Sequence, residues 1–112
     1  MLLFKTYHVE PILSGKKTQT RRAWKNPRAK VGSVHLAKTE MLAGTHFAKV
    51  KILRVWKERL GDISPEDAQA EGGYTQRQFA EIFEAINGSY DPDLEITAVE
   101  FEVVEASASG GA

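Results

Sequence analysis

Residues 15–22, with the sequence GKKTQTRR, carry the side chains whose types and spacing could do chemistry. An amine (Lys17), a hydroxyl (Thr20) and a guanidinium (Arg22) fall within six positions. A threonine hydroxyl becomes a nucleophile only when a base takes its proton, and a neutral lysine amine can be that base. Nearby positive charges and partial burial both favour the neutral amine. The segment therefore predicts a nucleophilic site.

The use of Lys17 as a base depends on where the strand begins. If residues 18–22 are extended, Thr18, Thr20 and Arg22 share one face, because successive side chains of a strand alternate. Lys17 then reaches the Thr20 hydroxyl only from a turn that precedes the strand. Residue types alone favour a simpler alternative, in which the lysine is solvated and the threonine merely suits a strand.

The charge of the chain is balanced overall but unevenly distributed. Fifteen basic and fifteen acidic side chains give a formal net charge of zero, which by itself argues against a nucleic-acid partner. Residues 1–59, however, hold 14 Lys or Arg and three acids (+11), whereas residues 60–112 hold one base and 12 acids (−11). Such a basic run is often only a solvated face, but it could give a phosphate-bearing ligand a local positive field. The bases of residues 16–30, where there is no acid, are Lys16, Lys17, Arg21, Arg22, Lys25, Arg28 and Lys30.

Length and composition predict one globular domain. A chain of 112 residues can bury a single core, and 42% hydrophobic with 27% charged residues is the balance of a folded protein. The absence of cysteine excludes disulfides, thiolate metal sites and thiol nucleophiles. No apolar run approaches the roughly 20 residues of a membrane helix. We expect a cytoplasmic protein that does not enter a membrane, with a domain over residues 1–105 and a disordered tail over residues 106–112.

The first half of the chain predicts mostly strands. In its longest apolar run the alternation slips at Leu53, which a β-bulge or sharp bend would explain. The expected strands cover residues 2–7, 18–23, 34–36 and 47–56, with a short helical turn around residues 11–13.

The second half predicts two helices and a closing strand. Ser64, with Asp67 three positions later, is typical of a helix N-cap, and Thr75 with Gln78 is typical of a capping box. Residues 94–105 alternate as a strand with one face in the core and one in water. Five or so strands with a late helical insertion indicate a small mixed β-barrel of the α+β class. The apolar stripe of the second helix, which ends at Gly88, is Phe79, Ile82, Phe83 and Ile86.

Residues 12–22 closely resemble the signature of the ASCH domain family, written G-x-K-x-x-T-x-R. The four signature positions are occupied by Gly15, Lys17, Thr20 and Arg22. The similarity continues through a Val-Gly pair at residues 31–32, a helix start near residues 63–64 and a closing strand over residues 99–101. It is greatest to small stand-alone prokaryotic and archaeal-type members, and it implies a PUA-like β-barrel fold.

The resemblance also implies an activity. Some small bacterial members are amidohydrolases that remove the acyl group of N4-acetylcytidine and related N4-acylated cytosines. Their proposed catalytic residues correspond here to Lys17, Thr20 and Glu71, with the threonine as nucleophile and the lysine as base. Arg22 is then expected to contact the oxyanion or the substrate. Because the third position lies in a variable region, Glu66 or Asp67 could take the place of Glu71.

An RNA-binding module without catalytic activity is the alternative. In such a module the basic run would contact backbone phosphates, and Trp24 could stack on a base or simply fill the core. An RNA-cleaving variant is a further possibility within the family, but the sequence offers no clear general acid and base for it. Besides Arg22, the expected substrate or RNA contacts are Lys16, Arg21, Trp24, Lys25, Arg28 and Lys30.

We expect no metal and no cofactor. His8, His35 and His46 share no metal-ligand spacing. The expected partner is a nucleoside, a nucleotide or a short single-stranded RNA, bound by a monomer. Trp56 lies in an alternating strand and is expected to be packed.

Overall fold

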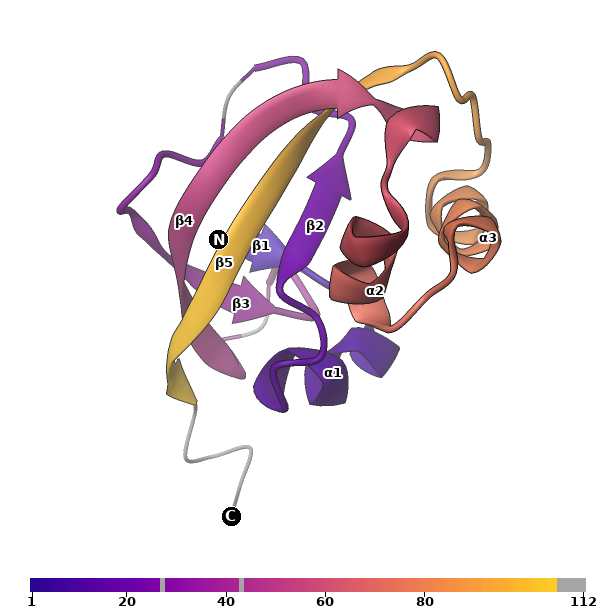
Figure 1. Ribbon diagram of the computed structural model, residues 1–112. Coiled ribbons are helices and arrows are strands. Elements are labelled where there is room, and N and C mark those ends of the chain that lie inside the picture. Colours follow the sequence, from indigo (N-terminus) through magenta and orange to yellow (C-terminus); the bar gives the residue numbers. More distant parts are fainter. Residues whose placement is uncertain (27, 43, 107–112) are drawn as a thin grey trace.

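The computed structural model describes residues 1–26, 28–42 and 44–106 and places five strands in one sheet of order β1-β3-β4-β5-β2. The sheet is strongly curled into a half-barrel, with helices along its open side (Figure 1). The strands are β1 (Leu2–Leu3), β2 (Gln19–Arg22), β3 (Val34–Lys38), β4 (Ala48–Arg59) and β5 (Glu95–Ala106). The helical elements are η1 (Thr6–His8), α1 (Val9–Leu13), η2 (Leu60–Asp62), α2 (Pro65–Gly72) and α3 (Gln76–Asn87). The expected α+β class with a helical insertion between the last two strands is confirmed.

The two longest strands, β4 and β5, form the antiparallel centre of the sheet. Their pairing shifts register between Lys49 and Val50 and again between Ile52 and Arg54. The second shift spans Leu53, where the apolar alternation of the sequence slips. A bulge adds a residue to one strand and increases the local twist, so these shifts help the sheet to curl.

Strand β5 separates two hydrophobic clusters. Val99 and Phe101 belong to the cluster inside the curled sheet, whereas Ile96 and Ala98 pack against the helices on the opposite face. The prediction of one wet face along this strand is therefore wrong for residues 96–99, all of which are buried. The helical insertion covers the face that alternation alone would have left in water.

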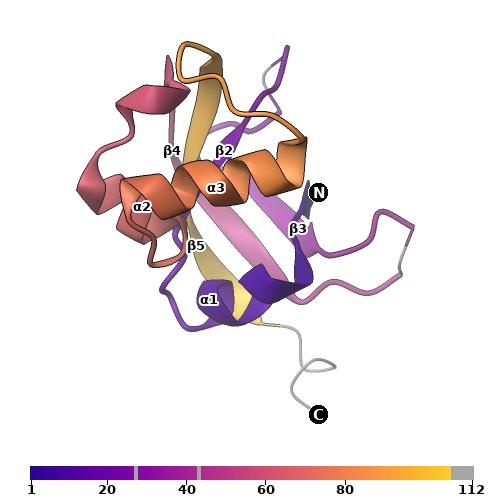
Figure 2. The ribbon, with the colours of Figure 1, turned by 90° about the vertical axis from the view of Figure 1, so that its right-hand side faces the viewer.

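Both helices of the insertion begin as the sequence predicts. The Ser64 side chain accepts a hydrogen bond from the Asp67 backbone at 3.0 Å, and Thr75 and Gln78 form a reciprocal capping box. Helix α3 then crosses in front of the curled sheet (Figure 2) and ends at Gly88, whose φ is 86°. Only glycine adopts such a positive φ at little cost, which explains the helix stop.

The N-terminal strand is shorter than expected. It ends at Leu3, and η1 follows where residues 4–7 were predicted to be extended. The early turn accompanies the burial of Ile12 and His8, at 1% and 5% exposure, and burial of apolar surface favours such a turn. At the other end β5 includes Ala106, whereas the rest of the predicted tail lies outside the described residues. None of the helices in the described residues is long and apolar enough to cross a membrane.

Candidate active site

A cavity of about 320 Å³ lies between the curled sheet and the helical insertion. One side is polar and includes Lys17, Thr20, Arg22 and Glu71. The other side is apolar and comes from α3, through Phe79, Ile82, Phe83 and Ile86. The structure thus brings the lysine, threonine and arginine of the motif together with one acid of the insertion.

Lys17 lies in the turn before β2, as the predicted geometry requires. Gly15 has a φ of 82°, and the Lys17 backbone N–H donates to the Pro11 carbonyl at 2.9 Å, so that the chain reverses directly after α1. The side chain is buried, and its Nζ donates to the Gln19 carbonyl at 2.8 Å. It also donates to the Glu71 carbonyl at 2.8 Å and to Glu71 Oε1 at 3.2 Å. These three acceptors use all the protons of an ammonium group.

Burial lowers the pKa of the Lys17 amine, because a charged group is costly to hold away from water. The Glu71 carboxylate opposes this shift through its charge and its hydrogen bond, whereas the positive charges of Arg22 and Arg21 add to it. The amine therefore loses its proton more readily than a lysine in water, which is the condition for its use as a base.

Thr20 is buried in β2 and is held by Arg22. Arg22 Nε donates to Thr20 Oγ1 at 2.8 Å, and its Nη2 donates to the Leu3 carbonyl at 2.7 Å. The guanidinium carbon lies 5.0 Å from the centre of the Phe4 ring. Among the hydrogen bonds of the described residues none joins Lys17 to Thr20, because the amine is directed toward α2 instead. Lys17 and Thr20 thus share the cavity without the direct contact that was expected.

Glu71 is the acid that contacts the lysine. It is 5% exposed, and its two carboxylate oxygens have different partners: Oε1 accepts from Lys17, and Oε2 accepts from Arg21 at 2.8 Å. Glu66 is exposed, and Asp67 accepts from Gln19 and Arg21 rather than from the lysine. Of the three acids that the sequence leaves open, only Glu71 therefore meets the motif lysine.

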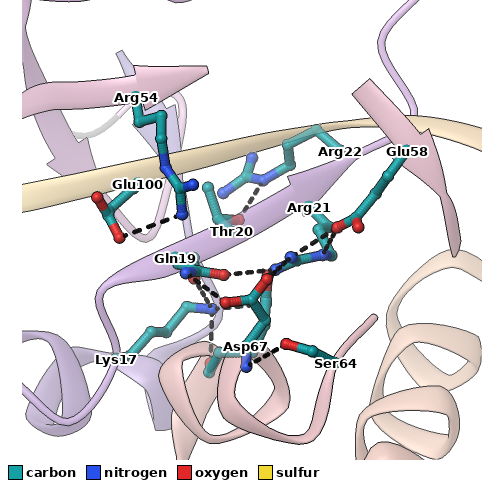
Figure 3. A network of polar contacts seen from close by, with 11 residues as sticks. Lys17, Gln19, Thr20, Arg21, Arg22, Arg54, Glu58, Ser64, Asp67 and Glu100 are labelled. Carbon is teal, nitrogen blue, oxygen red and sulfur yellow. Dashed lines mark hydrogen bonds and ion pairs between the residues drawn. The ribbon is translucent and has the colours of Figure 1, made fainter. Parts of the chain in front are cut away.

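Arg21 points away from Thr20 and is enclosed by carboxylates (Figure 3). Its Nη2 lies 2.6 Å from Glu58 Oε1 and 3.2 Å from Asp67 Oδ2. Arg21 is among the residues that line the cavity, but its guanidinium donors are occupied by Gln19 and three acids, so its expected contact with a ligand stays a prediction. The same face carries Trp56, half-buried against the second cluster as expected, with the Arg21 guanidinium 5.5 Å from its ring centre.

The remaining predicted contacts lie outside the cavity lining. Trp24 is half-buried against the first cluster, so much of its ring is used in the core. The other bases are exposed and are not among the residues that line the cavity: Lys16, Lys25, Arg28 and Lys30.

His8 and Tyr74 also line the cavity, and sequence reasoning missed them. His8 Nε2 and the Tyr74 hydroxyl are 2.8 Å apart. Burial, together with the positive charges of Lys17 and Arg22, lowers the pKa of His8 to about 4, so this histidine is neutral near pH 7. In the sequence, the pair of glycines after Glu71 is the feature that could have indicated the position of Tyr74. Gly72 and Gly73 have φ values of 156° and 82°, which reverse the chain and return the tyrosine to the cavity.

The polar side of the cavity carries groups that could take part in nucleophilic chemistry on a small ligand. Within residues 1–26, 28–42 and 44–106, no three His, Asp or Glu side chains are grouped so as to hold a metal ion. The cavity instead combines a buried amine, a hydroxyl that accepts from a guanidinium, and a carboxylate.

Comparison with known proteins agrees with this fold. The ASCH domain model matches residues 4–105. The structure of a protein from Enterococcus faecalis has a TM-score of 0.71 at 20% identity, over 95% of this chain and 72% of that chain. An ASCH domain from Lactobacillus crispatus has a TM-score of 0.66 at 17% identity, over 93% and 77%. ASCH from Zymomonas mobilis has a TM-score of 0.62 at 12% identity, over 96% and 72%.

These structural similarities lie below the level of identity that would carry over an activity, so they establish the fold alone. No curated protein matches the chain. The family match, however, spans nearly the whole sequence and includes the motif that lines the cavity. This chain is therefore a member of the ASCH domain family with its PUA-like fold.

Proposed function

We propose that the protein hydrolyses the N4-acyl amide of N4-acetylcytidine or a related nucleoside. The observation that carries this proposal is the convergence of Lys17, Thr20 and Glu71 on one cavity that also contains Arg22. A buried amine with a lowered pKa in the same cavity as a hydroxyl is a combination that can support acyl transfer.

Arg22 prepares the nucleophile in this mechanism. Its Nε–H donates to Thr20 Oγ1, so the hydroxyl oxygen accepts and its own proton remains available for transfer. The positive charge also stabilises the alkoxide that forms as the proton leaves. Within the described residues Arg22 Nη1 has no hydrogen-bond partner, and it can donate to the oxygen of the ligand.

The reaction then has two halves. Thr20 Oγ attacks the acyl carbon while neutral Lys17 takes its proton, and collapse of the tetrahedral intermediate breaks the C–N bond. Lys17 returns the proton to the departing amine of cytidine. Water then attacks the threonine ester with the lysine again as base, releasing the carboxylic acid and restoring the hydroxyl. One of the lysine hydrogen bonds to α2 must be given up for the amine to reach Thr20 Oγ1.

The size and lining of the cavity favour a nucleoside over a nucleic-acid strand. About 320 Å³ lies at the small end of the range for small-molecule sites. The apolar α3 wall is suited to the face of a pyrimidine or to an acyl group, and the polar side is suited to the amide.

Turnover of N4-acetylcytidine to cytidine and acetate, separated by chromatography, tests the proposal. We expect activity in the wild type and its loss in Lys17→Ala and Thr20→Val, with partial activity in Thr20→Ser. Thr18→Val is the matched control, because Thr18 is a half-buried threonine that does not line this cavity. No turnover by the wild type, or full turnover by Thr20→Val, would exclude the mechanism.

RNA binding is a second candidate, supported by the exposed bases Lys25, Arg28 and Lys30. These side chains lie outside the cavity and are free to contact phosphates. If they do, affinity for a short single-stranded RNA should fall as salt rises, in proportion to the phosphates neutralised. Alanine at all three positions should abolish binding without affecting deacylation. Binding that does not depend on salt would count against this function.

A further inference from the structure

The Glu71 carboxylate is shared between two buried cations. Lys17 Nζ lies 3.2 Å from Oε1, and Arg21 Nη1 lies 2.8 Å from Oε2. Both cationic side chains are almost fully buried, at 3% and 0% exposure, so solvent screens these contacts very little. The shorter contact belongs to the arginine.

Arg21 is itself held in place from the other side. Nε and Nη2 both lie within 2.7 Å of Glu58 Oε1, Nη2 lies 3.2 Å from Asp67 Oδ2, and Nη1 donates to Gln19 Oε1 at 2.9 Å. The planar guanidinium presents its donors in a fixed fork, so contacts on several sides fix its orientation. Its hold on Glu71 Oε2 is therefore rigid.

We propose that Arg21 is a positioning residue for the Lys17 amine: it occupies one oxygen of Glu71 and so prevents that carboxylate from pairing with the lysine through both oxygens. The proposal rests on the proposed function for the role of the lysine as base. Without Arg21 the carboxylate would pivot toward the lysine, stabilise its ammonium form and keep it away from Thr20.

The other charged and titratable groups around Lys17 support this reading of the site. Arg22 faces it from β2 and His8 from η1. Glu71 from α2 opposes the effect of burial on its pKa, and the positive charge of Arg21 adds to that effect. The strength of the Glu71 contact therefore influences how easily the amine becomes neutral. Arg21 is placed to limit that contact.

The direct test is the ionisation of Lys17, which needs no substrate. Nuclear magnetic resonance of ¹³C- and ¹⁵N-labelled lysine follows the nine side-chain amines through a pH titration, and Lys17→Arg identifies the signal. In Arg21→Gln we expect the Lys17 pKa to rise by about one unit, which is a tenfold smaller neutral fraction at a given pH. Arg21→Lys keeps a positive charge but loses the planar guanidinium donors, so the Lys17 pKa should rise less than in Arg21→Gln. Because its charge is retained, this variant should also fold more readily.

Arg54→Gln is the matched control. Arg54 lies on the same face of the sheet, stacks 4.0 Å from the Trp56 ring centre and pairs with Glu100, but it does not touch Glu71. The Arg54→Gln variant removes the same charge as Arg21→Gln but leaves the contacts of Glu71 intact, so the Lys17 pKa should be unchanged. An equal shift in this control would overturn the proposal, because it would indicate a general charge effect.

A second comparison separates positioning from direct repulsion. If Arg21 acts mainly through Glu71, then Arg21→Gln should raise the Lys17 pKa much less in a Glu71→Gln background, where only the direct effect of its charge remains. A rise of the same size in that background, or no rise in either Arg21 variant, would overturn the proposal. In activity assays Arg21→Gln should lower kcat and shift the pH profile upward while KM stays constant. If the protein does not hydrolyse N4-acetylcytidine, only this activity assay is lost, and the titration of Lys17 still tests the proposal.

Discussion

The two faces of β2 place adjacent arginines in opposite roles. Arg22 faces the cavity and donates to a hydroxyl and a carbonyl, and its Nη1 has no hydrogen-bond partner among the described residues. Arg21 faces α2 and β4, where three carboxylates enclose it. An arginine saturated by acids acts through the carboxylates that it holds, whereas Arg22 contacts only neutral groups. Partners rather than residue type therefore distinguish an arginine that orients other side chains from one that faces a cavity.

Loss of Arg21 should have the largest effect on stability. Arg21→Met leaves Glu58, Asp67 and Glu71 without their shared cation, and breaking a buried ion pair from one side costs about 3–5 kcal/mol. The free energy of unfolding, measured with urea, should fall by this amount. If Arg21→Met lowered the free energy of unfolding by less than Arg22→Met does, Arg21 would not be the more important of the two for stability.

Loss of Arg22 should mainly affect activity. Arg22→Met removes the donor to Thr20 Oγ1 and the donor available to the ligand, so kcat/KM should fall on the order of 100-fold. Steady-state kinetics with N4-acetylcytidine measures the fall, and circular dichroism checks that the fold is retained. Unchanged kinetics in a folded variant would remove Arg22 from the mechanism.

The cavity side should also respond to pH through His8. Because its pKa is lowered to about 4 in the folded protein, the unfolded chain binds the extra proton between about pH 6.5 and 4. The contribution of the neutral histidine to stability is complete above pH 6.5 and is lost as pH falls through this window. Between pH 7 and 5 we expect a decrease on the order of 1–2 kcal/mol in urea unfolding.

His8→Gln should flatten this decrease between pH 7 and 5. His46→Gln is its control, because His46 does not line the cavity, and it should follow the wild type. A pH dependence that is the same in all three proteins would show that acids elsewhere cause it.

The smallest effect is expected at Arg54, which lies on the same face of the sheet as Arg21. Arg54 is 57% exposed and lies 3.7 Å from Glu100, so the pair is solvent-screened. Arg54→Gln should change the free energy of unfolding by less than about 1 kcal/mol. The free energies of unfolding of Arg54→Gln and Arg21→Met, both measured with urea, show whether the burial of an arginine on this face determines its contribution to stability.

Much of the architecture follows from local sequence patterns. The caps at Ser64 and Thr75, the helix stop at Gly88 and the slip at Leu53 all depend on neighbours within a few positions. The short first strand and the burial of residues 96–99 were not predicted. Both result from packing between segments far apart in the chain, which periodicity does not record.

The candidate site was predicted less completely. The motif supplies Lys17, Thr20 and Arg22, but the choice of Glu71 over Glu66 or Asp67 depends on which turn of α2 meets β2. A backbone bond from Thr18 to the Ala70 carbonyl, at 2.8 Å, sets that meeting point. His8 and Tyr74 come from segments 66 positions apart, so no local spacing links them.

By itself the sequence determines the motif, the helix boundaries, the family and the separation of positive and negative charge along the chain. The tertiary structure alone decides where those charges meet. It buries Arg21 among acids of β4 and α2 and leaves Arg22 at the cavity, although the two are neighbours in the sequence. The reason is physical: a strand sends adjacent side chains to opposite faces, and only the packed fold determines what each face contains.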